Sequence, residues 1–113
     1  LRFSGLKISS VFGEVHLFRM PSTDGADGKL RPVLVLFDLE ADAVVCRITS
    51  VLRTGVLDVI LSGWTEEGLL KPSVARLDRI VTMEKTLLVK KLGKLSSADL
   101  EAVRMRWNSL MKL

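Results

Sequence analysis

The sequence predicts a mainly β fold, a small twisted barrel-like sheet followed by one C-terminal α-helix. Residues 14–93 hold a series of short apolar or alternating segments separated by turn-forming residues, which is typical of consecutive strands. From Ser96 onward the apolar residues change to helical spacing. At 113 residues, 48% of them hydrophobic, the chain is long enough for one domain. We therefore expect a single domain over residues 1–113, with residues 1–12 as an N-terminal extension.

The first two predicted strands flank a long polar segment. Glu14–Arg19 alternates polar and apolar residues, so Val15 and Leu17 should face the core and His16 should face solvent. Met20–Lys29 is rich in glycine, aspartate and proline and is longer than a tight hairpin needs, which marks it as a candidate functional lid. Arg31–Asp38 is almost continuously apolar, as expected for a strand that runs through a core.

The remaining elements follow in order. After a turn at Asp38–Asp42, we expect strands at Ala43–Leu52, Leu57–Leu61, Val74–Met83 and Leu87–Gly93, a single helical turn at Gly63–Gly68, and a break around Glu84 and Lys85. Ser96 or Ser97 can cap the terminal helix, with Asp99 in a capping-box arrangement with Ser96. Leu100, Val103, Met105, Trp107, Leu110 and Met111 form its apolar positions.

Charge and cysteine content bear on the expected binding partner and cellular compartment. The basic and acidic residues balance over residues 1–60, so residues 61–113 carry the whole net charge of +4, which favours a polyanion or an acidic protein as partner. No apolar run approaches the roughly 18 residues of a membrane span, and the start does not read as a signal peptide. Cys46 is the sole cysteine and is interpreted as a small buried hydrophobic residue in a reducing cytoplasm.

Several kinds of catalytic site are excluded by residue content. One histidine, one cysteine and no cluster of three close carboxylates argue against a metal site, and we expect no cofactor. The scattered glycines form neither a phosphate loop nor a dinucleotide fingerprint. Thr49 and Ser50 have no adjacent histidine base, so a serine-hydrolase triad is not indicated.

Arginine, hydroxyl and carboxylate groups remain as candidates. Arg31 opens the apolar strand, Thr49 and Ser50 lie on the next strand, and Arg76 and Asp78 are two residues apart, so they share one face of a strand. Guanidinium groups with hydroxyl donors suit a phosphoryl group. The same residue types also occur as solvated ion pairs and as ordinary strand residues, so both interpretations stay open.

A resemblance bears on this choice. Gly13-Glu14-Val15, the Lys29–Leu36 strand, Ile48-Thr49-Ser50, the Gly68–Arg76 segment and Leu92–Ser96 occur in this order. Together they resemble the MazF/PemK toxin family, endoribonucleases of bacterial type II toxin–antitoxin pairs, over about Gly13 to Leu110. Each motif is weak by itself, and their order and spacing carry the resemblance.

The resemblance implies an SH3-like β-barrel, a homodimer, and metal-independent cleavage of single-stranded mRNA that inhibits translation and growth. It further implies a cognate acidic antitoxin as partner, with DNA contacted only through that antitoxin, and no membrane. The implied catalytic residues are Arg31, Thr49, Arg76 and Asp78. As substrate-binding residues we expect Lys29, Ser50 and His16, the last only if it borders the groove. Some members use a histidine in the first loop, which residues 20–29 lack, and this shifts the expected base to Asp78.

Two alternatives remain. A gyrase poison of the CcdB type shares the barrel and depends on a C-terminal Trp-Gly-Ile ending, whereas this sequence ends in Trp107-Asn108-Ser109-Leu110-Met111-Lys112-Leu113. A non-catalytic nucleic-acid-binding SH3-like module is the second alternative. The presence of Arg31, Thr49, Arg76 and Asp78 argues against it.

Overall fold

The computed structural model describes residues 11–19 and 28–113, so the expectations for residues 1–10 and for residues 20–27 of the candidate lid lie outside the described residues. The elements are β1 (Glu14–Arg19), β2 (Leu30–Leu39), β3 (Asp42–Thr49), β4 (Asp58–Leu61), β5 (Ser73–Glu84), the short 3-10 turn η1 (Lys85–Leu87), β6 (Leu88–Lys94) and α1 (Ser97–Leu110). This order confirms the mainly β fold with a C-terminal helix.

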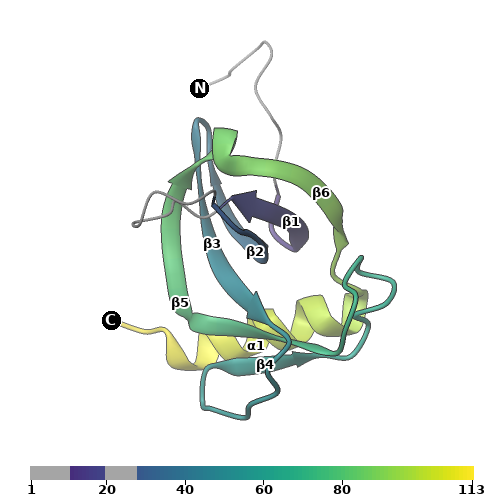
Figure 1. Ribbon diagram of the computed structural model, residues 1–113. Coiled ribbons are helices and arrows are strands. Elements are labelled where there is room, and N and C mark those ends of the chain that lie inside the picture. The colour runs from purple at the N-terminus through teal and green to yellow at the C-terminus, as the bar shows by residue number, and fades with distance from the viewer. Residues whose placement is uncertain (1–10, 20–27) are drawn as a thin grey trace.

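The strands form one strongly curled antiparallel sheet (Figure 1). Their order is β4-β5-β3-β2-β1-β6, so β4 and β6 are the two edges. The two edges do not pair in the described part of the chain, and the predicted barrel is therefore open. Figure 1 shows α1 and β4 at one end of the sheet, with the β2–β3 hairpin turn at the other end.

The apolar sequence of β2 is explained by burial on both of its faces. Leu34 and Leu36 belong to the larger core, which also receives Val103 from α1. Val33 and Val35 point the other way, into a smaller cluster with Phe18. Because successive side chains of a strand alternate between faces, a strand covered on both sides must be apolar at nearly every position.

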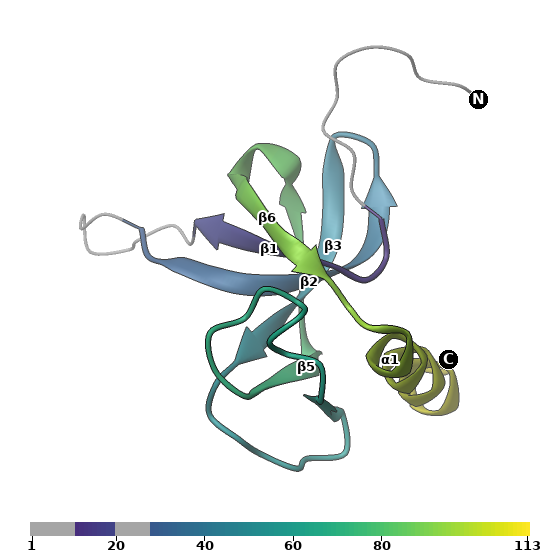
Figure 2. The ribbon, with the colours of Figure 1, turned by 90° about the vertical axis from the view of Figure 1, so that its right-hand side faces the viewer.

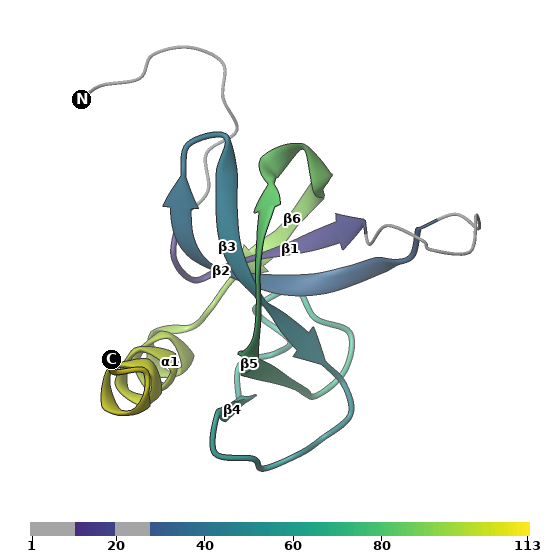
Figure 3. The ribbon, with the colours of Figure 1, turned by 90° about the vertical axis from the view of Figure 1, so that its left-hand side faces the viewer.

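A carboxyl pair joins α1 to the 62–69 segment. Figures 2 and 3 show where α1 lies relative to the sheet. Ser96 caps the helix by accepting a hydrogen bond from the Asp99 backbone N–H, at 3.2 Å. Asp99 accepts bonds from the Ser62 N–H (3.1 Å), the Ser62 hydroxyl (2.8 Å) and the Gly63 N–H (2.9 Å). Glu67, fully buried beside Asp99, accepts a bond from the Ser96 N–H at 2.9 Å. These bonds hold the segment that precedes β5 against the start of the helix.

Two local predictions need correction, and a third is confirmed. His16 is only 4% exposed rather than on the surface, because β1 lies between β2 and β6 and the curled sheet covers both of its faces. The third strand ends at Thr49 and not at Leu52, since the chain turns away from the sheet there. The predicted single helical turn at Gly63–Gly68 is present, because the Glu67 N–H donates to the Gly63 C=O and Gly68 ends the turn at φ +89°.

Candidate functional site

A groove of about 650 Å³ runs over the ends of β2 and β3. Its wall contains three of the predicted site residues, Arg31, Thr49 and Ser50. The other residues that line the groove are Leu17, Leu30, Pro32, Arg47, Ile48, Val51, Gly68, Leu69, Leu70, Lys71, Ser73 and Leu92. The charged residues in this set are all basic, so the groove suits an anionic ligand.

The register of the sheet explains why Arg31 and Thr49 meet at this groove. Val33 of β2 pairs with Arg47 of the antiparallel strand β3. Arg31 and Thr49 each lie two residues beyond that pair, at the same end of the two strands. Two residues is one full pleat, so both side chains keep the orientation of the Val33–Arg47 pair.

Both residues have donor capacity that the fold leaves unused. The Thr49 hydroxyl oxygen accepts a hydrogen bond from the Val51 N–H at 3.1 Å. Because a hydroxyl group both accepts and donates, its hydrogen remains available for a ligand. Arg31 is exposed, and within the described residues it makes no ion pair. A guanidinium and a hydroxyl donor thus face the same groove.

Arg47 and Lys71 line the groove as well, although sequence reasoning did not select them. Arg47 was recognisable, because it lies two residues before Thr49 on the same predicted strand and so on the same face. Lys71 lies within the Gly68–Arg76 motif of the family resemblance, but no strand pattern indicates where a residue of an irregular segment points.

Arg76 and Asp78 form the expected pair but do not line this groove. The Arg76 Nη2 atom donates to the Asp78 carboxylate at 3.2 Å. Arg76 also lies 3.9 Å (Nε to Oδ1) from Asp58, a buried carboxylate that accepts bonds from Arg53 and the Gly55 N–H. Burial by itself would raise the pKa of Asp58, but the bonds from Arg53 and Gly55 and the charges of Arg53 and Arg76 outweigh it and lower the pKa.

The register nevertheless brings Arg76 close to the groove. Arg76 of β5 pairs directly with Arg47 of β3 on one side and with Asp58 of β4 on the other. Directly opposed residues of an antiparallel pair share a face. Arg76 therefore lies one strand away from a residue of the groove wall, and two carboxylates hold its guanidinium.

The other two predicted binding residues, His16 and Lys29, do not line the groove, although each is next to a residue that does. His16 Nε2 is 3.0 Å from Glu14 Oε1, and Lys91 donates to the other oxygen of Glu14 at 3.1 Å. Burial opposes ionisation of Glu14, but the bonds from His16 and Lys91 outweigh it and lower the pKa. Lys29 is exposed just before β2 and is not part of the groove wall.

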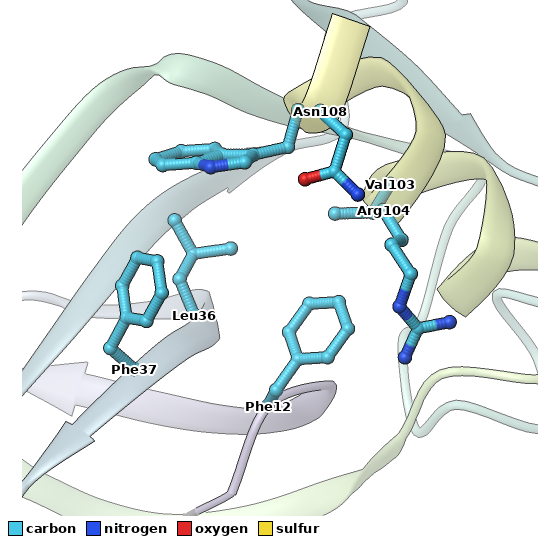
Figure 4. Close-up of a pocket in the computed structure, with 7 residues that line it drawn as sticks. Phe12, Leu36, Phe37, Val103, Arg104 and Asn108 are labelled. Carbon is cyan, nitrogen blue, oxygen red and sulfur yellow. The ribbon is translucent and has the colours of Figure 1, made fainter. Parts of the chain in front are cut away.

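A second hollow, of about 370 Å³, lies between α1 and the sheet (Figure 4). Phe12, Leu36, Phe37 and Val103 give it apolar walls. Among the described residues that line it, Arg104 is the only charged one, and its guanidinium lies 5.4 Å from the Phe12 ring centre and is bonded to Glu101. This hollow lacks the free basic groups of the first groove and is the poorer site for an anion.

Neither a reactive thiol nor a metal centre is found among the described residues. Burial raises the pKa of Cys46 to about 12, which confirms its interpretation as a buried hydrophobic residue. Within residues 11–19 and 28–113, no group of three or more histidine, cysteine, aspartate or glutamate side chains is placed to hold a metal ion. None of the helices there is long and apolar enough to cross a membrane.

Comparison with known proteins identifies the family. The model of the PemK-like, MazF-like toxin of type II toxin–antitoxin systems matches residues 12–111. The chain belongs to this toxin family. The match confirms the resemblance found in the sequence motifs, and it covers the whole groove.

Solved structures of the MazF-like toxins share the fold. The Mycobacterium tuberculosis toxin MazF-mt6 matches with a TM-score of 0.70 at 24% identity, over 87% of this chain and 96% of that one. An endoribonuclease in complex with its cognate antitoxin from a mycobacterial species matches with a TM-score of 0.71 at 19% identity, over 91% and 95%. MazE–MazF from Deinococcus radiodurans matches with a TM-score of 0.67 at 21% identity, over 88% and 91%. No curated protein sequence matches significantly.

Proposed function

We propose that this MazF-like toxin is a metal-independent endoribonuclease that cleaves single-stranded RNA in the groove at Arg31 and Thr49. The observation that carries the proposal is the groove itself. Among residues 11–19 and 28–113 it combines a guanidinium without an ion pair, a hydroxyl whose hydrogen is available, two further basic residues and no carboxylate. A phosphodiester backbone is the ligand whose charge and acceptor oxygens match that set.

The reaction uses a nucleophile that the substrate already contains. The ribose 2′-oxygen attacks the adjacent phosphorus, the bond from phosphorus to the 5′-oxygen breaks, and the products are a 2′,3′-cyclic phosphate and a 5′-hydroxyl. A base takes the 2′-hydroxyl proton, and water supplies a proton to the leaving 5′-oxygen. The protein must chiefly stabilise the charge that develops on the phosphoryl oxygens.

The groove residues divide this work. The Arg31 guanidinium binds the phosphoryl oxygens, and the Thr49 hydroxyl donates a further hydrogen bond to them. An arginine side chain is a poor proton carrier because it stays protonated up to about pH 12. Asp78 is the proposed base, and Arg76, which holds its carboxylate, supplies positive charge beside Arg47. In this structure Asp78 is exposed outside the groove wall, so substrate must approach the Arg76–Asp78 edge for that step.

We further propose the cellular setting that such an activity requires. Cleavage of mRNA in the cytoplasm would inhibit translation and growth. An acidic antitoxin would suit the basic groove and exclude RNA from it, and DNA would be reached only through that antitoxin. The active form would be a homodimer.

Incubation of the purified protein with a long single-stranded RNA in EDTA tests the proposal. We expect cleavage that leaves cyclic phosphate ends, and a loss of about a hundredfold or more in rate for Arg31→Ala. Lys112→Ala is the matched control, since it removes one exposed positive charge away from the groove. Intact RNA, or equal rates for Arg31→Ala and the wild type, would overturn the proposal. Intact RNA together with inhibition of DNA gyrase would instead favour the gyrase poison.

A further inference from the structure

A smaller hollow of about 270 Å³ adjoins the groove on the same sheet. Arg31 and Arg47 line both, so the two spaces meet at these side chains. Phe18, Val33 and Val45 give the smaller hollow an apolar floor, since all three belong to the smaller core cluster. Arg79, Ile80 and Val81 of β5 complete the wall.

A bulge in β5 brings Arg79 to this hollow. Cys46 and Arg47 are consecutive on β3, but their partners on β5 are Ile80 and Arg76. Residues 77–79 are therefore left without partners on β3. A bulge bends its strand and redirects the side chains within it. Leu77 turns into the larger core, whereas Arg79 is exposed at the hollow.

The described charges around this hollow are all of one sign. Of the residues that the structure describes, its wall contains Arg31, Arg47 and Arg79 and no carboxylate. Within the described residues none of these three arginines forms an ion pair, and the nearby Asp78 is bonded to Arg76. The hollow thus attracts an anionic polymer, as the adjoining groove does.

The apolar floor separates this hollow from a simple phosphate site. A phosphate gains nothing from contact with Phe18 and two valines, whereas a nucleobase has an apolar face that packs on such a surface. A guanidinium stacks on the same kind of face and also donates to base-edge acceptors. The combination fits a base whose own phosphates lie toward the arginines.

We propose that this hollow is a nucleobase subsite. It takes a base of the nucleotide next to the phosphate held by Arg31 and Thr49, and Arg79 is the residue that contacts that base. The inference rests on the proposed function, since it requires single-stranded RNA in the adjoining groove. It adds Arg79 of β5 as a specificity-determining residue. Of the residues of β5, only Ser73 lines the groove itself.

Binding of uncleavable single strands tests this subsite independently of cleavage. The probes are 2′-O-methyl homopolymers of uridine, cytidine and adenosine, each about ten nucleotides long. Fluorescence anisotropy gives the Kd of each over a series of salt concentrations. The proteins are wild type, Arg79→Met and Lys112→Met, the last removing the same charge from an exposed residue that does not line the hollow.

We expect Arg79→Met to weaken binding of the preferred homopolymer about fivefold to tenfold and to reduce the differences in Kd among the three bases. The salt dependence should stay as in the wild type, and Lys112→Met should behave as the wild type. Equal weakening of all three probes, with a salt slope lower by about one, would mean a phosphate contact and overturn the subsite. Unchanged binding would overturn it as well.

Two further outcomes distinguish the base subsite from the proposed ribonuclease activity and from a peptide-binding site. Wild-type protein that binds the probes with base preference but fails to cleave unmodified RNA would overturn the ribonuclease and leave the subsite supported. Loss of poly-glutamate binding in Arg79→Met, with oligonucleotide binding unchanged, would assign the hollow to an acidic peptide and overturn the subsite.

Discussion

Replacing Glu67 with glutamine should stabilise the protein at about pH 8 and have a much smaller effect at about pH 5. The Glu67 side chain is fully buried, and its Oε1 atom has no hydrogen-bond donor in the described structure. Burial, with the adjacent Asp99 carboxylate, raises the pKa of Glu67 to about 7. Below that pH Glu67 is a neutral acid that can donate to Asp99.

The sign and size of the effect follow from this raised pKa. The folded chain retains the Glu67 proton up to about pH 7, whereas the unfolded chain releases it near the ordinary value of 4.5. The contribution of Glu67 is therefore full below pH 4.5 and is lost as the pH rises to 7. Over these 2.5 pH units, at about 1.4 kcal/mol per unit, the loss is at most about 3.5 kcal/mol. A glutamine amide donates to Asp99 at every pH and so avoids this loss.

Urea unfolding at several pH values between about 5 and 8 measures the difference. Trp64 and Trp107 pack against the core that the unfolding exposes, so tryptophan fluorescence reports the transition. Glu66→Gln is the matched control, because Glu66 is the exposed neighbour of Glu67. Asp99, whose pKa is lowered through its bonds to Glu67, Gly63 and Ser62 despite burial, titrates below this range. A Glu67→Gln stability gain that stays constant with pH would refute the reasoning.

Three further predictions concern the surroundings of the groove. Thr49→Val should reduce RNA cleavage at least about tenfold in a gel assay with little change in Tm, because it removes the hydroxyl donor and retains the β-branch; unchanged cleavage would exclude Thr49 from catalysis. Gly68→Ala should destabilise the fold by about 2 kcal/mol or more in urea titrations, since Gly68 has φ +89° and a Cβ would strike the Leu92 carbonyl. Asp58→Asn should cost about 2–4 kcal/mol at neutral pH, because Arg53 and the Gly55 N–H lose their charged acceptor and Arg76 loses a buried counter-charge. That cost should shrink as the pH falls below the ordinary Asp58 pKa of 3.8, and a cost independent of pH would contradict the ion-pair account.

Local patterns in the sequence predicted most of the fold. β1 begins and ends at the predicted residues, and the helix begins at the Ser96 cap. These successes share a cause, since alternation, capping and turn-forming residues act through neighbours along the chain. The site was predicted less completely. Arg31, Thr49 and Ser50 line one groove, but Arg76 and Asp78 lie beside it and His16 is buried.

The sequence by itself determined the order of the elements, the family and the strand-end arginine of the groove. The tertiary structure alone decided which faces are covered and which side chains meet. His16 is buried because the sheet curls over both sides of β1, and alternation within one strand carries no information about that curl. Arg79 reaches the second hollow because β5 gains three residues relative to β3. Register between strands distant in sequence arises only when the sheet assembles, and here it determines how far the groove extends.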